Sequence, residues 1–405
     1  MSKVRSVLIV GGGVAGPVTA LALRKAGIDA TVYEAYPSAA DGIGGTLAIA
    51  PNGQAALDVV GALAAATAGA LPITKTAMSF GRKSVELPRL AGLPPMRLVH
   101  RSELYRGLYE VAVAAGVRFE HGKRLIGLDE GAGGVTARFA DGGTATADVV
   151  VGADGVHSTV RGLIDPDAPG PGYTGMLGFE AVVDRPVPIE TGTMCFAFGR
   201  RAYYLYWRRP DGRTGFGANL PQDRPMRLTQ ARAVPAERWL RRLRETYGQD
   251  EPGGDLVRHI EPDRLTVTGS LHIMPSVPRW YRGNVVLVGD AVHAPSNSSG
   301  QGASLAIESA IELARCLRDL PDTASAFAAY ERLRRPRVEG IAARAAKINH
   351  MKAPGTVARA VLPVLMRLLM KTAMRPEKAF GAEQRYRIDW SAPVVTGAKT
   401  LSVGG

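Results

Sequence analysis

A glycine-rich segment close to the N-terminus restricts the fold more than any other feature of the sequence. Residues 6–10 form a short apolar run of the kind that builds buried strands in parallel sheets. Gly11, Gly13 and Gly16 follow at once, and apolar residues then recur at helical spacing. A second strand is predicted over residues 29–34. This order of strand, glycine turn, helix and strand predicts a βαβ unit of a Rossmann-like domain.

The spacing within this unit suits a dinucleotide. The glycines permit a tight turn, close approach of a diphosphate and tight helix packing, and the helix start offers unpaired N–H groups to phosphate. Glu34 lies eighteen residues beyond Gly16 and can accept hydrogen bonds from a ribose. A second match to the pattern, Gly170-x-Gly172-x-x-Gly175, has neither a preceding strand nor a following helix, so we interpret it as a loop.

Two later segments place an aspartate at the end of a predicted buried strand. Residues 148–152 lead into Asp154, and residues 285–288 lead into Asp290. Ligands collect at the carboxyl ends of strands in open α/β sheets, so both aspartates are candidate ligand contacts. The alternative is that each aspartate only caps a turn. A loop rich in Pro, Ser and Gly follows the second strand, and after it a helix is predicted to end near Leu317.

A β-rich region, residues 173–272, interrupts this α/β pattern. Its aromatic residues alternate as they do in strands, and Asp211-Gly212 marks a hairpin turn. The residues that share a parity are Met194, Phe196 and Phe198 in one run and Tyr204 and Tyr206 in the next. From residue 326 the pattern is helical, and an apolar stripe over residues 357–369 predicts a docked C-terminal helix, with a membrane-surface helix as the alternative.

Composition and charge exclude several classes of protein. The two cysteines, Cys195 and Cys316, exclude a disulfide scaffold and a cysteine-rich zinc site, and they fit a cytoplasmic protein. No apolar stretch reaches the roughly 20 residues of a membrane span, so we expect no stable membrane insertion. The formal charge of +13 is dispersed and comes without a nucleic-acid-binding signature, so we expect no nucleic-acid partner.

The three motifs, in this order, resemble the single-component (class A) FAD-dependent aromatic monooxygenases, which include para-hydroxybenzoate hydroxylase and the tetracycline-inactivating monooxygenases. The resemblance rests on GGGVAG with Glu34, on GADGVHSTVR at residues 152–161 and on the Gly-Asp segment at residues 289–310. Residues 387–390 are similar to the tail of many relatives. The resemblance covers most of the chain.

This resemblance implies a mixed α/β (α+β) fold in which a β-sheet substrate domain is inserted into a Rossmann-like FAD-binding domain, with a C-terminal helix after them. The FAD-binding domain is therefore discontinuous in sequence. The implied boundaries are 1–75, 97–165 and 280–350 for the FAD-binding domain, 76–96 and 166–279 for the substrate domain, and 351–405 for the C-terminal helix and tail.

The resemblance also implies roles for individual residues toward FAD. The glycine turn would hold the diphosphate, Glu34 the adenosine ribose and Asp290 the ribityl chain, while residues 42–52 resemble the loop that borders the flavin ring. Arg101 would reach FAD from a helix start, with a surface arginine beside a Ser102 N-cap as the alternative. The implied cofactor contacts are Gly11, Gly13, Val14, Ala15, Gly16, Glu34, Ala35, Gly45, Arg101, Leu125, Asp154, Asp290, Gly300, Gly302, Ala303 and Ser304.

The implied reaction uses bound FAD, with NADPH or NADH as a transient hydride donor. Reduced flavin would react with O2 to form a C4a-hydroperoxide that hydroxylates or epoxidises an aromatic or polyketide-like small molecule. No side chain is predicted as the catalytic group and no metal site is expected, because the flavin carries the chemistry. The alternatives are an FAD-dependent reductase or oxidase of the same fold and a non-catalytic nucleotide or lipid carrier. We expect a monomer or a weak homodimer.

Aromatic residues of the β-rich region are candidate walls for a flat substrate. The alternative is that they form the core of the sheet against helices, and the sequence leaves open which parity faces the flavin. The candidates are Phe179, Phe196, Phe198, Tyr204, Tyr206 and Phe216, with Pro295 from the Gly-Asp segment. Many relatives carry an arginine near Glu180 and bulkier residues over residues 294–298, so these departures predict an altered substrate pocket.

Overall fold

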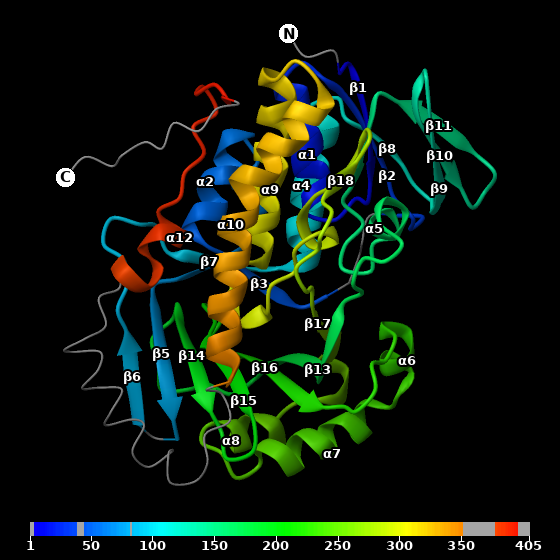
Figure 1. Ribbon diagram of the computed structural model, residues 1–405. Helices are drawn as coiled ribbons and strands as arrows, with labels where there is room; N and C mark the ends of the chain where they lie inside the picture. Colours follow the sequence, from blue (N-terminus) through cyan, green and yellow to red (C-terminus); the bar gives the residue numbers. More distant parts are fainter. Residues whose placement is uncertain (1–3, 39–43, 82, 351–376, 396–405) are drawn as a thin grey trace.

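The computed structural model describes residues 4–38, 44–81, 83–350 and 377–395. A helix-covered, mostly parallel sheet occupies one half of the molecule, and a broad, mostly antiparallel sheet occupies the other (Figure 1). The C-terminal helix predicted over residues 357–369 lies outside the described residues. Across the described ranges, no helix is long and apolar enough to cross a membrane.

The parallel sheet forms from the apolar runs that precede the motifs, as predicted. Its six strands lie in the order β18-β19-β12-β1-β2-β8, and β18 is antiparallel to its neighbour. The central strands are buried, which explains their nearly continuous valine, leucine and isoleucine residues. In sheet order the strands are Tyr281–Arg282, Val285–Leu287, Val149–Gly152, Ser6–Val10, Asp29–Tyr33 and Arg118–Glu120.

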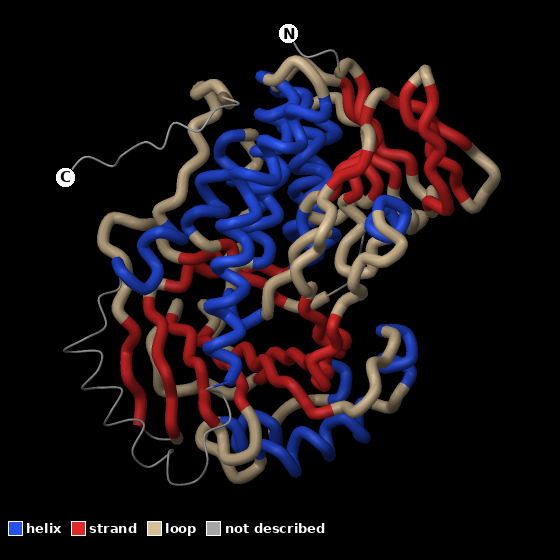
Figure 2. The backbone as a smooth tube through the Cα atoms, in the orientation of Figure 1, coloured by secondary structure: helices blue, strands red, loops and turns tan. Residues whose placement is uncertain are grey.

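Most of the helices of this half lie on one side of this sheet (Figure 2). The helix after the glycine turn is α1, Ala15–Lys25, and it packs against α9, Gly302–Asp319, which in turn packs against α10, Thr323–His350. The other helices of this half are α2 Pro51–Val59, α3 Leu63–Ala66, α4 Arg101–Ala114 and α5 Thr159–Ile164, with the short turns η2 Gly289–Ala291 and η3 Asn297–Ser299. The C-terminal segment adds η4 Glu377–Gly381 and α12 Ala382–Gln384.

Two small sheets complete this half. One has the order β3-β7-β4, and the other has the order β11-β10-β9. Their strands are Thr46–Ile49, Met96–His100 and Leu71–Ile73 in the first, and Thr144–Ala147, Gly134–Phe139 and Leu125–Gly131 in the second. The first sheet lies against the antiparallel half, because side chains of β4 and β7 pack into one cluster with side chains of that half.

The antiparallel half is a seven-stranded sheet with the order β17-β13-β16-β15-β14-β5-β6. Only the β14–β5 pair is parallel. Its strands are Leu265–Ile273, Gly172–Val183, Thr214–Pro221, Tyr203–Arg208, Thr193–Phe198, Lys75–Phe80 and Lys83–Leu87. The hairpin predicted at Asp211-Gly212 is confirmed by the pairing of β15 with β16. Helices α6 Leu228–Ala233, α7 Ala236–Tyr247 and α8 Gly253–Arg258 cover one face, and η1 Pro262–Arg264 leads into β17 (Figure 1).

The second glycine pattern is not the loop that the sequence suggested. β13 begins at Gly172, which pairs with Ile273 of β17, so residues 172–175 are strand. The strand forms because β17 supplies hydrogen-bonding partners from about a hundred residues away, a contact that local sequence does not reveal. No helix follows β13, so its exclusion as a dinucleotide turn still stands.

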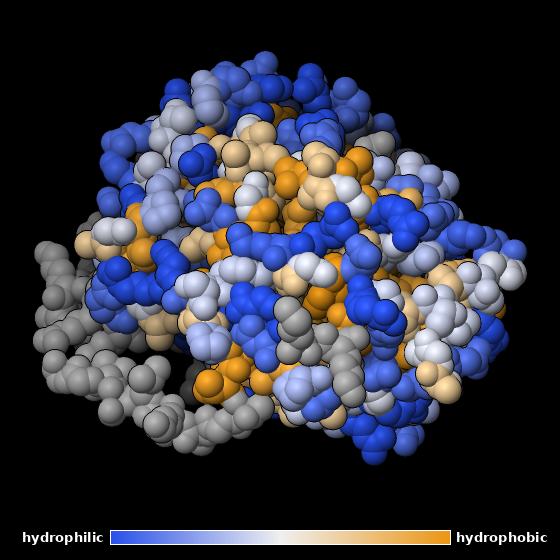
Figure 3. Space-filling model, turned by 90° about the horizontal axis from the view of Figure 1, so that it is seen from above, coloured by the Kyte–Doolittle hydropathy of each residue, from blue (hydrophilic) through white to orange (hydrophobic). Residues whose placement is uncertain are grey.

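Basic residues occur on many elements of both halves of the molecule. The arginine-rich stretches of the sequence lie on α7 and α10. Seen from above, hydrophilic residues surround smaller hydrophobic patches on the face shown (Figure 3). The arginines of α7 lie on a mostly solvated face, whereas on α10 Arg334 is fully buried and the Arg337 side chain is 11% exposed, which corrects the expectation of a solvated face for that helix.

The face of the seven-stranded sheet that α6, α7 and α8 cover allows a prediction about stability. Phe216 is completely buried, and its ring lies 5.7 Å from the Tyr204 ring and 6.0 Å from the Tyr247 ring. Phe216→Ala should lower the free energy of unfolding by about 3–5 kcal/mol, because it leaves a cavity in this core. Denaturant unfolding followed by circular dichroism measures the change. A loss below about 1 kcal/mol would show that the ring faces a space that tolerates truncation.

Candidate functional site

The three motif loops meet at the carboxyl edge of the parallel sheet, because β1, β12 and β19 are neighbours. Backbone hydrogen bonds hold the loops together. The Ala153 N–H donates to the Val10 carbonyl over 2.8 Å, and the Val288 N–H donates to the Gly152 carbonyl over 2.9 Å. Motifs that are more than a hundred residues apart in the sequence therefore form one continuous surface.

Each glycine of the first turn is required for a different reason. A Cβ on Gly11 would lie 2.5 Å from the Ala153 carbonyl oxygen, and the φ of Gly11 is +107°. A Cβ on Gly16 would lie 1.9 Å from the Gly11 carbonyl oxygen, so α1 can approach the turn only through a glycine. At Gly13 the nearest atom to a Cβ is Tyr105 Oη, 3.9 Å away. The space over Gly13 is therefore open, and it forms a recess at a helix start that fits a diphosphate.

Glu34 follows β2 on one side of this recess. Its Oε2 accepts the Gly12 N–H over 2.6 Å, and its Oε1 accepts the Tyr36 N–H over 2.9 Å. The carboxylate is thus fixed on the glycine turn, and its remaining lone pairs are available to a ribose. Ala35 lies in the turn that follows, and the buried Leu125 begins β9. Contacts of these residues with adenosine stay predictions.

Asp290, Arg101 and Tyr105 gather at the recess as well. Asp290 is exposed, yet the surrounding protein desolvates its carboxyl and raises its pKa, which the Arg101 guanidinium opposes. A group that is both accessible and desolvated lies in a recess rather than on the outer surface. Burial also raises the pKa of Tyr105, Arg101 lowers it, and Asp290 and Glu34 raise it. The four side chains therefore lie near one another.

Tyr105 is a site residue that the sequence reasoning missed. It lies one helical turn after Arg101 on α4, so the i, i+4 relation to a predicted contact is the signal that could have identified it. The helix start also differs from the alternative interpretation of Arg101, because His100 and not Ser102 occupies the N-cap. The His100 ring contacts the Ser102 hydroxyl at 2.7 Å. Arg101 is therefore the first residue of α4.

The second motif has a structural role in this arrangement. The Asp154 carboxylate accepts the Thr159 N–H over 2.7 Å and also accepts the Ser158 hydroxyl. Burial raises the pKa of Asp154, and these hydrogen bonds oppose the rise. Arg161 donates to the Ala291 carbonyl over 2.8 Å and so ties this loop to the third motif. Asp154 thus accepts N–H groups at the start of α5, whose N-cap is Ser158, and its direct contact with FAD stays a prediction.

The start of α9 packs against the residues that precede α2. The Ser304 hydroxyl accepts the Ala50 N–H over 3.1 Å, and a Cβ on Gly53 would lie 2.5 Å from Ser304 Oγ. Nothing lies within 4 Å of a Cβ on Gly302, so the first turn of α9 borders open space. Helix-start N–H groups carry partial positive charge, which favours the electron-rich edge of a flavin. The contacts with FAD at Gly300, Gly302, Ala303 and Ser304 stay predictions.

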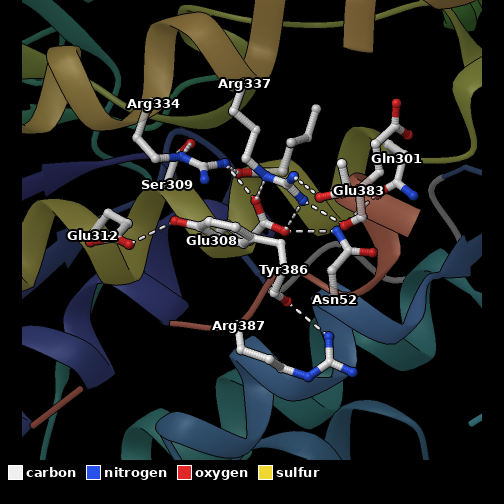
Figure 4. A network of polar contacts seen from close by, with 12 residues as sticks. Asn52, Gln301, Glu308, Ser309, Glu312, Arg334, Arg337, Glu383, Tyr386 and Arg387 are labelled. Carbon is white, nitrogen blue, oxygen red and sulfur yellow. Dashed lines mark hydrogen bonds and ion pairs between the residues drawn. The ribbon is translucent and has the colours of Figure 1, made fainter. Parts of the chain in front are cut away.

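Further along α9, beyond its first turn, lies a buried network of ion pairs (Figure 4). Glu308 and Arg334 are fully buried and form an ion pair at 2.7 Å, and Arg337 Nε donates to the same carboxylate over 2.8 Å. Although burial opposes ionisation, the arginines keep the pKa of Glu308 below its ordinary value. The Asn52 amide donates to Glu308 over 2.7 Å and to Gln301 over 2.9 Å. The network therefore fixes α2, α9 and α10 relative to one another.

The residues before β3 connect the recess to the antiparallel sheet. A Cβ on Gly44 would lie 2.7 Å from Arg101 Cδ, and a Cβ on Gly45 would lie 2.6 Å from Glu180 Oε2. The Thr46 N–H donates to that same oxygen over 2.6 Å. The segment that resembles the flavin-bordering loop thus contacts a cofactor-side arginine and a residue of the sheet. Contact of Gly45 with FAD stays a prediction.

Four of the aromatic candidates lie on the wrong face of the sheet for substrate binding. They are at most 5% exposed and belong to the core under α6, α7 and α8. They are Phe179, Tyr204, Tyr206 and Phe216. This corrects the prediction that they contact substrate, and it follows from the alternation of side chains along a strand. The alternative, a core packed against helices, describes these four residues.

Side chains on the other face of the seven-stranded sheet point toward the cofactor half. Phe196 and Met194 pack with Ile73 and Leu98, which come from β4 and β7. Phe198 lies on the same side of β14 as Met194 and Phe196. The pairing of β14 with β15 places Phe198 opposite Tyr203. Phe196 and Phe198 therefore remain candidate substrate residues, and their contact with substrate stays a prediction.

Pro295 lies on the loop between η2 and η3. It is buried and lines a cavity of about 270 Å³ together with Trp280, His293 and Val338. This cavity is bounded by α10. Contact of Pro295 with substrate stays a prediction. His293 Nε2 contacts the Ser309 hydroxyl at 2.8 Å, and burial lowers the pKa of His293 to about 3, so the ring is neutral.

The recess and its rim fit FAD part by part. Glu34 suits the ribose, the open turn at Gly13 suits the diphosphate, and Asp290 suits a polyol chain. No cluster of three or more metal-ligating side chains exists among the residues that the structure describes. The arrangement around the glycine turn can hold a dinucleotide.

Sequence comparison relates the chain to FAD-dependent monooxygenases over most of its length. The family described as FAD binding domain matches residues 5–345. The 3-amino-4-hydroxybenzoate 2-monooxygenase PtmB3 of Streptomyces platensis is 32% identical over 370 residues, which cover 85% of this chain and 87% of that protein. The FAD-dependent urate hydroxylase of Klebsiella pneumoniae is 28% identical over 368 residues, which cover 85% and 90%.

Solved structures share the fold. Klebsiella pneumoniae HpxO complexed with FAD and uric acid has a TM-score of 0.77 at 23% identity and covers 95% of this chain and 97% of its own. Tetracycline destructase Tet(55) has a TM-score of 0.68 at 20% identity and covers 92% and 98%. The predicted mixed α/β fold with a Rossmann-like FAD-binding part is confirmed.

The glycine turn allows folding and cofactor binding to be separated. Gly13→Val should leave the apoprotein folded, because the space over Gly13 is open, and should lower FAD affinity at least about 100-fold. Gly16→Ala should instead destabilise the fold itself, because its Cβ would overlap the Gly11 carbonyl. Flavin absorbance of the purified variants and their unfolding midpoints measure the two effects. A yellow Gly13→Val protein with unchanged FAD affinity would remove this turn from the site.

His293 predicts a pH dependence of stability. Its folded-state pKa of about 3 lies below the ordinary value of 6.5, so the unfolded state binds the proton first as the pH falls. The stabilisation of the folded state by the neutral His293 ring is complete above pH 6.5 and is lost toward pH 3. Over that range the free energy of unfolding falls by up to about 1.4 kcal/mol per pH unit. The slope of the unfolding free energy between pH 6 and pH 4.5 should be shallower in His293→Gln than in the wild type. Equal slopes would show that the ring is protonated in the folded protein.

Proposed function

The chain belongs to the family of FAD-dependent monooxygenases that share this FAD binding domain, and we propose that it uses NAD(P)H and O2 to hydroxylate or epoxidise an aromatic or polyketide-like small molecule. FAD is its cofactor, and when bound it supplies hydride acceptance and oxygen activation, which no side chain provides. The protein's own residues bind this group, orient it and exclude water.

The link between the cofactor recess and the antiparallel sheet carries this proposal. The segment from Gly44 to Thr46 contacts Arg101 on the recess side and Glu180 on the sheet. A small molecule held on the sheet face of Phe196 would therefore lie beside the flavin ring. The relatives named above are a urate hydroxylase and an aminohydroxybenzoate monooxygenase, and their ring substrates support an aromatic substrate class.

The nicotinamide cofactor docks only transiently in this proposal. Within the described ranges, one glycine turn has the strand before it and the helix after it that a dinucleotide needs, and FAD takes that turn. The formal charge of +13 favours the more anionic NADPH over NADH. We place the protein in the cytoplasm, where reduced nicotinamide cofactors are available and where the buried thiols of Cys195 and Cys316 stay reduced.

Two other functions fit parts of the same structure. An FAD-dependent reductase or oxidase would use the same recess without inserting oxygen into its substrate. A non-catalytic nucleotide or lipid carrier would bind without turnover. The fate of molecular oxygen separates all three.

Isotope labelling tests the proposal directly. The FAD-loaded protein is incubated with NADPH and ¹⁸O2 across a panel of phenols and polycyclic aromatics, and products are analysed by mass spectrometry. We expect one labelled oxygen atom in the product for each NADPH that coupled turnover consumes. Substrate oxidation or reduction without label would favour the reductase or oxidase, and NADPH consumption that no compound stimulates would favour the carrier. Either result would contradict the proposed function.

A further inference from the structure

One carboxylate stands on the side of the antiparallel sheet that faces the cofactor half. Phe179 and Ala181 of β13 are buried under the helices, so Glu180 between them points to the opposite face. There its carboxylate contacts Thr46 of β3. The face is the one on which Met194 and Trp207 pack against β4 and β7.

The side chains around Glu180 are partly exposed. Gly217 lies opposite Glu180 on β16, and a Cβ there would make only ordinary contact, 3.7 Å from Leu205 Cβ. Asn219 and Thr268 on the flanking strands are half-buried, as Glu180 is. Their neighbours on the other face of the sheet are fully buried. Partial exposure on a face that looks toward the cofactor half shows that solvent reaches these residues.

The contacts with Thr46 leave the carboxylate able to bind a further group. One oxygen accepts the Thr46 N–H over 2.6 Å, and the other accepts the Thr46 hydroxyl. A carboxylate has about four acceptor positions, so about two remain. Thr46 holds the carboxylate in a fixed place, next to the segment that borders the cofactor recess.

The negative charge of Glu180 has no positive partner on this face. Strand pairing places the following residues on its side of the sheet: Met176, Gly178 and Val182; Met194, Phe196 and Phe198; Tyr203, Leu205 and Trp207; and Gly215, Gly217 and Asn219. None of these is charged, and among the described residues no salt bridge includes Glu180. On these four strands the face that carries Glu180 is therefore mostly apolar and aromatic, with one acidic group.

We propose that Glu180 selects substrates by charge. An aromatic substrate presents a hydrogen-bond donor to Glu180, from an ammonium, amide or hydroxyl substituent, and aromatic carboxylates are rejected. A like charge placed against a partly buried carboxylate is strongly unfavourable, whereas a donor gains a charge-assisted hydrogen bond. This inference rests on the proposed function, since it assigns the substrate class of the same site.

Three phenols that differ only in charge test the proposal. The FAD-loaded protein is titrated with 3-hydroxybenzylamine, 3-hydroxybenzamide and 3-hydroxybenzoate, and the change in flavin absorbance gives each Kd. The wild type should bind the amine at least about 10-fold more tightly than the benzoate, with the amide between them. Glu180→Gln retains an acceptor for the Thr46 N–H and removes the charge, so the ratio of the two Kd values should fall toward one.

Two further variants control for folding and for ligand size. Glu86→Gln removes an equal charge from an exposed position on β6 of the same sheet and should leave the ratio as in the wild type. Glu180→Arg should reverse the preference and bind 3-hydroxybenzoate, even if the wild type binds none of the three phenols. FAD content and unfolding midpoint are measured for every variant.

The outcomes separate this proposal from the proposed function. Tighter binding of the benzoate by the wild type, an unchanged ratio in Glu180→Gln, an equal effect of Glu86→Gln, or no binding of any phenol by any variant would each overturn the charge selection. Labelled oxygen in a product would uphold the monooxygenase function whichever way the ratios fall. A structural clamp alone would change the unfolding midpoint without changing the ratio.

Discussion

The buried carboxylate of Glu308 is the interaction on which the cofactor side of the molecule depends. Arg334, Arg337 and Asn52 bind it, and Glu308 and Arg334 have no exposed side-chain surface (Figure 4). A buried charge that loses its partner costs about 3–5 kcal/mol, so α2, α9 and α10 have to come together for the carboxylate to be accommodated. The Tyr386 ring lies 4.0 Å from the Arg337 guanidinium, so the C-terminal segment covers the same network. The first turn of α9 is thereby held beside the glycine turn.

One place where the two halves of the molecule meet is the segment before β3. Gly44 and Gly45 bring the backbone before β3 against Arg101 and Glu180, and side chains at either position would prevent the approach. The cofactor recess ends on one side of this segment, and the inward face of the seven-stranded sheet begins on the other. In the function that we propose, this segment lies between a cofactor bound at the edge of one sheet and a substrate held on the other. Glu180 contributes to that junction and carries the charge that we assign to substrate selection.

Local sequence patterns predicted the elements whose structure depends on residues close together in the sequence. The order of strand, glycine turn and helix, with Glu34 after it, predicted the βαβ unit, and Asp290 became a candidate because it follows a buried strand. Sheet parity was beyond such reasoning, since a shift of one residue exchanges the faces. Tyr206 was for that reason assigned to substrate, although it lies in the helix-covered core. The start of β13 and the partners of Glu308 depend on residues distant in sequence, which no local pattern contains.

A crystal structure of the protein with FAD tests most directly where the cofactor binds, which is the central claim. The account predicts the diphosphate over Gly13, the ribityl chain within hydrogen-bonding distance of Asp290, and the flavin ring between the segment at Gly45 and the sheet face that carries Glu180 and Phe196. Difference density for the cofactor decides between these positions and any other. A flavin ring on the helix-covered side of the sheet, or a diphosphate away from the first glycine turn, would contradict the account.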